Sequence, residues 1–164
     1  MTILTEKAFS EIVEAHTDAA LTLARYILRS REDAEDAVQE TFIKVYRHYH
    51  QYDATRSLKN WILAIAVNTC RDLMRKRKGT GRTDPLESER VADPSAGREQ
   101  TEAALLVREV LGRLSADHRT ALLLFYMEGN SVKEMAKILK VPQVVVKVRL
   151  YRARKAAQKI LIEE

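Results

Sequence analysis

The chain has very little of several things that particular folds and compartments require. Among its 164 residues Cys70 is the only cysteine, so no intrachain disulfide can form, which fits a reducing compartment. Three prolines, five glycines and little alternation of β-branched residues favour helices over strands. No segment approaches the roughly 20 apolar residues of a membrane span, and the N-terminus has no apolar run of signal-peptide length. We therefore expect an all-α, soluble, cytoplasmic protein without membrane insertion.

The sequence also lacks the patterns of catalytic and metal sites. The four histidines are scattered, and there is no nucleophile elbow or glycine-rich phosphate loop. The acids of residues 31–40 have no histidine or third ligand at a fitting spacing. We expect no enzyme, no cofactor and no metal site, and we expect Cys70 to be a buried helix residue.

Charge is abundant but unevenly placed. The formal net charge is +5 and the pI is about 9.4. Residues 131–164 carry nine Lys/Arg against three Glu, and residues 71–82 carry six Lys/Arg against one Asp. Residues 31–40 carry five acids against one Arg. Two basic patches and one acidic patch indicate two contacts with a polyanion and one contact of another kind.

Glycine and proline divide the chain into two parts. Three of the five glycines and two of the three prolines lie between residues 79 and 97, in a stretch without apolar periodicity. We expect two small helical domains, at residues 1–78 and 99–164, joined by a flexible linker at residues 79–98. In the first domain, apolar stripes predict a helix over residues 5–28 and two more that begin at the capping residues Ser30 and Ser57. The stripe of the middle helix includes Tyr46 and Tyr49.

Residues 131–155 predict a helix-turn-helix. Ser131 and Glu134 have the spacing of a capping box, and Pro142 suits the first turn of a second helix. That second helix places Val146, Leu150, Ala153 and Ala157 on one packing side. Its other sides carry side chains suited to bases and phosphates, namely Lys147, Tyr151 and Arg152, and further cations suited to phosphates, namely Arg149, Arg154 and Lys155. The alternative is a plain helical hairpin with a solvated basic face.

The helix that begins at Ser57 carries a second pattern. Trp61, Asn68, Arg71 and Arg75 share one side, and an aromatic ring, an amide and cations suit single-stranded DNA. This helix ends in a basic run at residues 75–78. The alternative is a core tryptophan, a solvated asparagine and cations favoured by the helix dipole.

The acidic patch forms a third pattern. An exposed strip is expected to contain Glu32, Asp36, Gln39, Glu40 and Ile43. Such a strip is either a protein-binding surface or a solvated helix face with acids near its N-terminus.

Taken together, the segments DAEDAVQETFIKVYR, WILAIAVNTCRDLMRKRK and LSADHRTALLLFYMEGNSVKEMAKILKVPQVVVKVRLYRARK resemble an extracytoplasmic-function (ECF) sigma factor, a bacterial RNA polymerase sigma subunit. They resemble sigma regions 2.1–2.2, 2.3–2.4 and 4, in that order, over nearly the whole chain apart from the linker. The resemblance implies that Asp36, Gln39 and Glu40 bind the β′ coiled coil of core RNA polymerase. It further implies a contact of region 4 with the β flap, and an anti-sigma factor as a partner.

The resemblance also assigns promoter contacts. Asn68 matches a position that contacts an unpaired base of the −10 element, and the loop at residues 52–58 matches the segment that holds a flipped-out base. Lys147, Val148, Tyr151 and Arg152 match positions that read the −35 element. Where the family usually has G-T-V-K-S-R, this chain has Val144, Val145, Val146, Lys147, Val148 and Arg149. These valines either alter the −35 preference or bind a partner protein such as the anti-sigma factor.

We therefore expect an alternative sigma factor that binds core RNA polymerase and directs promoter-specific initiation. One alternative is a stand-alone helix-turn-helix regulator, which leaves the acidic strip unexplained. Another is a sigma-like adaptor that binds polymerase without reading DNA, which the valines favour.

Overall fold

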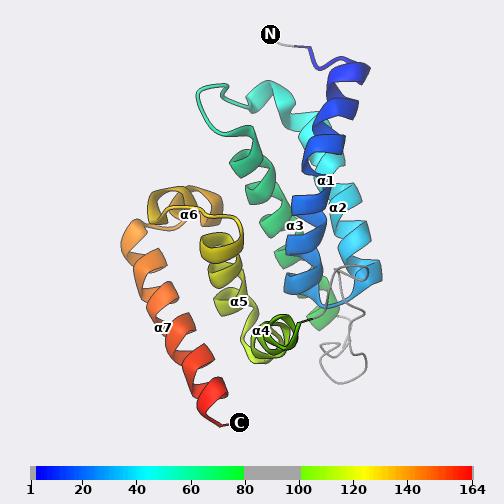
Figure 1. Ribbon diagram of the computed structural model, residues 1–164. Helices are drawn as coiled ribbons and strands as arrows, with labels where there is room; N and C mark the ends of the chain where they lie inside the picture. The colour runs from blue at the N-terminus through cyan, green and yellow to red at the C-terminus, as the bar shows by residue number, and fades with distance from the viewer. Residues whose placement is uncertain (1–2, 80–100, 164) are drawn as a thin grey trace. The chain divides into compact units, whose positions relative to one another are not determined.

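The computed structural model describes residues 3–79 and 101–163. The chain divides into two compact units, Met1–Asp84 and Pro85–Glu164. Within the described ranges the regular elements are all helical, as the sequence predicts (Figure 1). Gly79, the first residue of the expected linker, is the last residue of a helix, and the rest of that linker lies outside the described residues. None of the helices in the two described ranges combines the length and hydropathy of a bilayer span.

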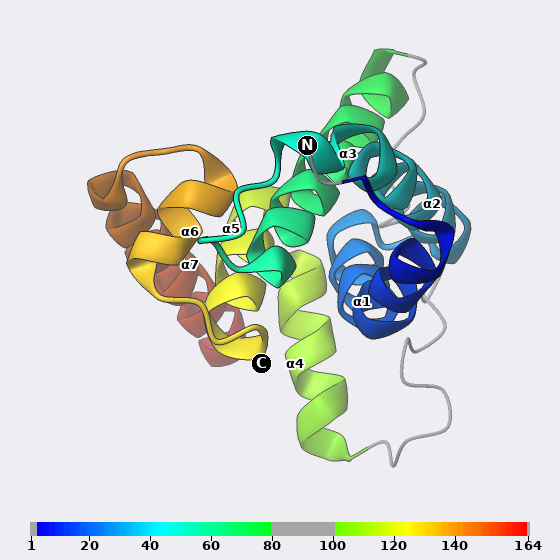
Figure 2. The same ribbon diagram turned by 90° about the horizontal axis from the view of Figure 1, so that it is seen from above.

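The first unit is a three-helix bundle of α1 (Glu6–Leu28), α2 (Arg31–His48) and α3 (Leu58–Gly79), with a 3₁₀ turn, η1 (Tyr49–Gln51), after α2 (Figure 2). A hydroxyl caps each helix: Thr5, Ser30 and Ser57 accept hydrogen bonds from the backbone N–H three residues on. Each cap satisfies an N–H that has no partner within the helix. The start of each helix is therefore set by local sequence.

Apolar stripes of the three helices meet in one core. The largest fully buried side chains of this unit are Ile27, Leu28, Val45, Ile62, Leu63 and Val67. Cys70 is also buried, and desolvation raises its pKa to about 12, as expected for a structural rather than a reactive thiol. Tyr46, predicted within the apolar stripe, is instead 56% exposed and meets Phe9 edge-on at 5.2 Å between ring centroids.

One cation of the basic run at residues 75–78 belongs to the core. The Arg77 side chain is 9% exposed; its Nη1 donates to the Leu28 carbonyl (3.2 Å) and its Nη2 pairs with the Asp33 carboxylate. Arg77 thus joins the C-terminal end of α3 to the turn between α1 and α2. It is not part of the exposed basic surface that its sequence neighbours suggest.

The second unit contains α4 (Glu102–Arg113), α5 (Ala116–Leu122), a π-helical segment η3 (Leu123–Met127), α6 (Val132–Leu139) and α7 (Gln143–Ile162). α7 contacts α4, α5 and α6. Arg119 is 3% exposed and its Nη1 donates to the carbonyls of Leu111 and Leu114 (3.2 and 3.1 Å), which satisfies acceptors at the end of α4. Arg119 is therefore a second structural arginine.

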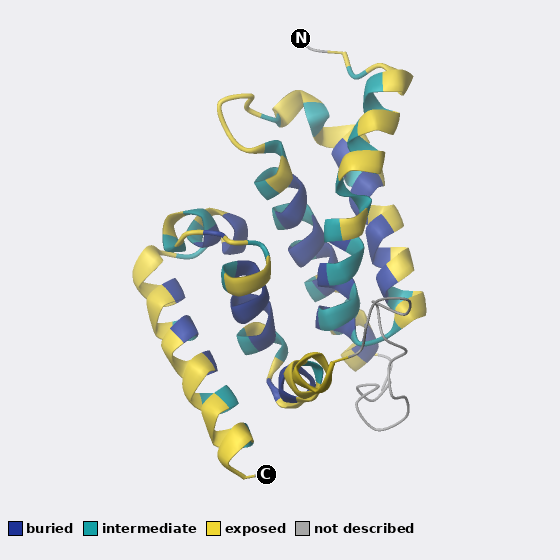
Figure 3. Ribbon diagram, viewed as in Figure 1, coloured by how far each residue is buried: buried dark blue, intermediate teal, exposed yellow. Residues whose placement is uncertain are grey.

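The predicted helix-turn-helix is present as α6 and α7. Ser131 and Glu134 form a complete capping box, and the C-cap residue Lys140 has the left-handed φ of 57°. Pro142 stands at the N-cap of α7, one residue earlier than the first-turn position expected for it. Val146, Leu150 and Ala153 are buried, so α7 presents a single packing side to the unit (Figure 3).

Candidate functional site

The acidic strip on α2 is exposed as predicted. Asp36, Gln39 and Glu40 are all exposed, and Ile43 is 43% exposed. Two other acids of this segment are engaged within the unit, since Asp33 pairs with Arg77 and Glu35 pairs with Arg31 (3.1 Å). The available charge on this face of α2 is therefore concentrated at Glu32, Asp36 and Glu40.

A charged cleft of about 500 Å³ separates the acidic strip from α3. Asp36 and Glu40 line one side, and Thr69, Asp72 and Arg75 line the other. Lys44 crosses it: its Nζ donates to Thr69 Oγ1 (3.0 Å) and lies 4.0 Å from an Asp72 oxygen. Asp72 also pairs with Arg75 (3.1 Å). Lys44 and Asp72 thus link the acidic strip of α2 to Arg75 at the basic end of α3.

The predicted residues of α3 lie on the side away from the bundle core. Trp61, Asn68 and Arg71 are half-buried and Arg75 is exposed. Trp61 belongs to an aromatic cluster that sequence reasoning missed: the Tyr52 ring lies 5.2 Å and the Tyr49 ring 6.4 Å from it, centroid to centroid. The closeness of these tyrosines to Trp61 depends on how the chain turns between α2 and α3.

That turn, residues 52–57, is fixed by its own polar groups. Tyr52 Oη donates to the Arg56 carbonyl (2.5 Å). Burial, with smaller effects of Tyr49 and Asp53, raises the pKa of Tyr52, so its hydroxyl stays a donor at neutral pH. Asp53 Oδ1 accepts from the backbone N–H and the hydroxyl of Thr55 (2.9 and 2.8 Å), and these bonds lower the pKa of Asp53. The loop next to Trp61 is therefore ordered by hydrogen bonds to a carboxylate.

On α7 the side opposite the core has a defined row of side chains. Val144, Val148, Tyr151 and Lys155 recur at intervals of four, three and four residues, which places them in one line along the helix. Lys155 Nζ lies 5.7 Å from the centre of the Tyr151 ring, a cation–π distance. By helical geometry Lys147 lies on one flank of this outer row, whereas Arg149 and Arg152 lie on the other.

Arg154 differs from the other predicted DNA-binding cations. Its Nε donates to Tyr126 Oη (2.9 Å), and its guanidinium lies 5.2 Å from the centre of the Phe125 ring and 5.7 Å from that of Tyr126. These contacts tie α7 to the π-helical segment. The spacing along α7 alone gave no sign of this bond, because the partner is 28 residues away.

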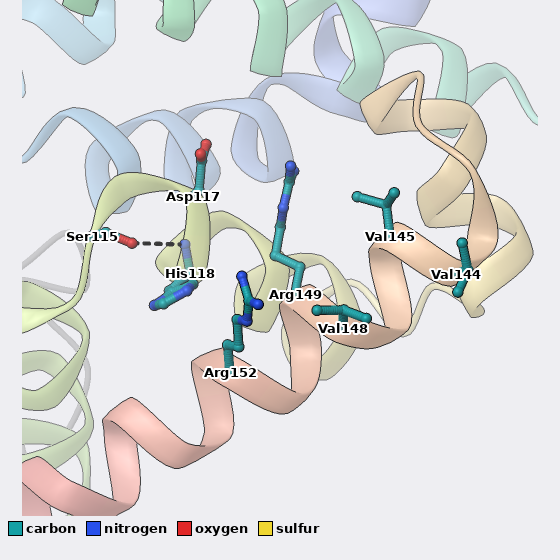
Figure 4. Close-up of a pocket in the computed structure, with 8 residues that line it drawn as sticks. All are labelled: Ser115, Asp117, His118, Val144, Val145, Val148, Arg149 and Arg152. Carbon is teal, nitrogen blue, oxygen red and sulfur yellow. Dashed lines mark hydrogen bonds between the residues drawn. The ribbon is translucent and has the colours of Figure 1, made fainter.

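A cleft of about 410 Å³ lies between the first turns of α5 and α7. Ser115, Asp117 and His118 line it from α5 and its cap, opposite the α7 side chains Val144, Val145, Val148, Arg149 and Arg152. Arg149 and Arg152 extend from α7 toward the first turn of α5 (Figure 4). Arg149 Nη1 is buried and has no hydrogen-bond partner among the described residues.

An apolar groove of about 360 Å³ is a third feature of this unit. Leu106, Val107, Tyr126, Met127 and Leu161 are among the residues that line it, from α4, η3 and the end of α7. Val107, Tyr126 and Met127 are 54%, 63% and 52% exposed. No residues were predicted to line such a groove; the run of large apolar residues at 105–107 is the signal in the sequence that points to it. The described residues contain no group of His, Cys, Asp and Glu that could bind a metal ion.

Comparisons with known proteins assign both units to one family. Residues 12–80 match the Sigma-70 region 2 family and residues 104–156 match the Sigma-70, region 4 family. The chain is 34% identical to the ECF RNA polymerase sigma factor SigM of Mycobacterium tuberculosis, over 94% of this chain and 77% of SigM. It is 30% identical to the ECF RNA polymerase sigma factor SigW of Bacillus subtilis, over 95% of this chain and 90% of SigW.

Solved structures give the same assignment. The sigma factor RpoE, solved with the anti-sigma factor NepR from Bartonella quintana, is 28% identical with a TM-score of 0.79, over 94% of this chain and 97% of RpoE. CnrH, solved with the cytosolic domain of CnrY, is 25% identical with a TM-score of 0.71, over 98% of this chain and 91% of CnrH. The chain belongs to the ECF sigma factors and is an alternative sigma factor that binds core RNA polymerase and directs promoter-specific transcription initiation.

Proposed function

We propose that three exposed surfaces divide the work of this sigma factor. Residues 1–78 act as the region 2 domain, which binds core polymerase and the −10 element. Residues 99–164 act as the region 4 domain, which binds the −35 element, and residues 79–98 link the two. One observation carries the proposal: the acidic strip of α2, the outer side of α3 and the outer row of α7 each keep charged or aromatic side chains outside a well-formed core.

The acidic strip is the proposed docking surface for the β′ coiled coil. Asp36, Gln39 and Glu40 are exposed and have Ile43 beside them, so a basic partner helix would meet charge, an amide and one apolar contact. Charge complementarity of this kind sets partner choice and orientation more than total affinity. Polymerase binding is thus assigned to a face of α2 that carries none of the proposed DNA contacts.

The outer side of α3 is the proposed site for the unpaired −10 strand. Trp61, backed by Tyr49 and Tyr52, offers a stacking surface next to an ordered loop. Asn68 offers donors and acceptors for a base edge, and Arg71 and Arg75 offer charge for phosphates. A flipped-out base would lie against residues 52–58.

The outer row of α7 is the proposed reader of the −35 duplex, with its N-terminal half in the major groove. Lys147, Tyr151 and Arg152 are exposed and positioned for base edges and phosphates, and Val148 lies between them. Arg149 and Lys155 supply phosphate contacts. Arg154 uses Nε for Tyr126, which leaves its two terminal nitrogens for a phosphate.

Two protein contacts complete the proposal. The apolar groove of the second unit suits an apolar segment of the β flap, because its lining is almost wholly hydrocarbon. RpoE, a relative by fold and sequence, was solved with an anti-sigma factor, which supports an anti-sigma partner for this chain too. We place the protein in the cytoplasm with core polymerase, without an enzymatic activity or a cofactor of its own.

Run-off transcription with purified core enzyme on a genomic fragment library tests the function. A set of promoter-specific transcripts is expected. If the chain co-elutes with core in gel filtration but yields no specific transcript, the adaptor alternative replaces the proposal. If it selects DNA alone and never co-elutes with core, it is a stand-alone regulator.

A matched pair of charge reversals tests the docking surface in the same assay. Asp36→Arg is expected to lower core affinity by roughly 30-fold or more, because a like charge replaces a desolvated attraction. Glu14→Arg reverses an exposed acid of α1 and is expected to leave core binding unchanged. Equal loss in both variants would remove the acidic strip from the account.

A further inference from the structure

The outer row of α7 begins with two side chains that cannot form hydrogen bonds. Val144 is 65% exposed and Val148 is 43% exposed, one helical turn apart at the start of the second helix of the helix-turn-helix. A β-branched side chain on a helix strongly prefers one χ1 rotamer. Their methyl groups therefore occupy fixed positions on the part of a recognition helix that contacts base edges.

Cations flank this apolar pair on both sides. By helical geometry Lys147 lies on one flank. Arg149 and Arg152 lie on the other, along the cleft with α5 (Figure 4). An apolar protein surface laid over the valines would also desolvate these charges, which is costly unless each one finds a partner. In the major groove the same arrangement is favourable, because phosphates and guanine edges accept from the cations at either side.

The cleft contains a hydrogen-bond donor that has no acceptor among the described residues. Arg149 lines the same cleft as Val145 and Val148, and its Nη1 is buried without a hydrogen-bond partner among the described residues. A buried donor left unpaired lowers stability, and a nucleic-acid oxygen or ring nitrogen would satisfy it. Base edges and phosphates, unlike a hydrocarbon surface, bring such acceptors next to the valines.

The apolar group that a major groove offers is the C5-methyl of thymine. Resting on the proposed function of α7, we propose that Val144 and Val148 select thymine by methyl contact. The −35 element that this chain prefers then has thymines facing these two valines. The valines are about 6 Å apart along the helix, so the two thymines lie within roughly two base steps of each other.

The test begins with the reconstituted holoenzyme and a duplex library randomised over the −35 element. Thymidines of the selected sequence are then replaced by deoxyuridine one at a time, which removes a methyl group and changes no hydrogen bond of the base pair. Affinity at fixed salt is expected to fall about threefold to fourfold at each of the two positions that face the valines, the effect of burying one methyl group.

Protein variants identify which valine is responsible. Val148→Ala and Val144→Ala are each expected to abolish the thymine–uracil difference at one position and to retain it at the other. Alanine is the better helix former, so both variants keep the fold. Ile162→Ala, an apolar truncation one carbon larger at the far end of α7, where the side chain is 77% exposed, is the control and should retain both differences.

Three results would overturn the inference. Uracil tolerated everywhere, or a uracil penalty that survives both alanine variants, would show that the valines do not read methyl groups. They would then be assigned to a protein partner such as the anti-sigma factor. If holoenzyme forms but the library yields no enriched sequence at all, the proposed −35 function of α7 fails and the inference fails with it.

Discussion

The two proposed DNA surfaces differ in how much of each is already fixed before DNA arrives. On α3, Trp61 is braced by two tyrosines, Arg75 is paired with Asp72, and the adjacent loop is tied by Tyr52 and Asp53. On α7 the outer side chains are exposed apart from the half-buried Arg149, and two contacts hold side chains in place there, Arg154 with Tyr126 and Lys155 with Tyr151.

The difference matches the two forms of nucleic acid that the surfaces are proposed to bind. An unpaired strand is flexible, so a rigid aromatic surface reduces what must be ordered on binding. A duplex is already rigid, so mobile lysine and arginine side chains can adjust to its phosphates and base edges. Each of the following variants changes one side of this comparison.

The largest effect is expected for Arg77, the buried residue that joins the end of α3 to the turn between α1 and α2. Arg77→Met leaves the Asp33 carboxylate without its partner, and breaking such a nearly buried pair costs about 3 kcal/mol of unfolding free energy. Urea unfolding followed by circular dichroism measures it. Lys76→Met removes an exposed neighbouring charge and should change stability by less than about 0.5 kcal/mol. Equal stabilities for the two variants would mean that Arg77 has no structural role.

The next largest effect is expected at the stacking surface. Trp61→Ala removes a base-stacking contact of about 1–3 kcal/mol, which is roughly a 5-fold to 150-fold loss of affinity for an unpaired −10 strand. The salt dependence of binding should not change, because no charge is lost. Trp61→Phe keeps a ring between α3 and the tyrosines and should recover much of the affinity. If Trp61 served only the fold, Trp61→Ala would instead lower the free energy of unfolding by about as much as it lowers the free energy of binding.

A smaller effect is expected from one cation of α7. Lys147→Ala should weaken duplex binding by roughly tenfold at low salt and reduce the slope of log affinity against log salt by about one. Lys7→Ala removes an exposed lysine from α1 and should leave the slope unchanged. An unchanged slope for Lys147→Ala would remove this residue from the phosphate contacts.

The smallest effect is expected in the loop beside Trp61. The pKa of Asp53 is lowered in the folded state, so its contribution to the turn is present at neutral pH. That contribution is lost as pH falls below the usual aspartate value of 3.8 and through the folded-state pKa. The amide resonance of Thr55 should shift over that acid range, and Asp53→Ala should lower single-strand affinity by about twofold at pH 7. A Thr55 amide that does not respond to acid would contradict the proposed bond.

Sequence reasoning succeeded where the determinants are local. The caps at Ser30, Ser57 and Ser131 act within three residues, and each forms the hydrogen bond expected of it. The packing side of α7 and the exposure of the acidic strip follow from helical periodicity alone.

Contacts between residues far apart in the sequence were not predicted. Arg77 meets Asp33 across 44 residues and Arg154 meets Tyr126 across 28, and neither partner is marked by spacing. The Tyr49–Tyr52–Trp61 cluster depends on the path of a loop, and the π-helical segment gave no sign in the sequence. The resemblance to sigma factors supplied the roles of the site residues, but not which cations are already bonded within the protein.

The most direct test of the account is a crossed binding measurement with holoenzyme on two probes, a single-stranded −10 oligonucleotide and a −35 duplex. Trp61→Ala is predicted to lose affinity for the single strand only, and Lys147→Ala for the duplex only. If each variant lost affinity for both probes equally, or if Trp61→Ala lost affinity for the duplex and Lys147→Ala for the single strand, the assignment of the unpaired strand to α3 and of the duplex to α7 would be wrong.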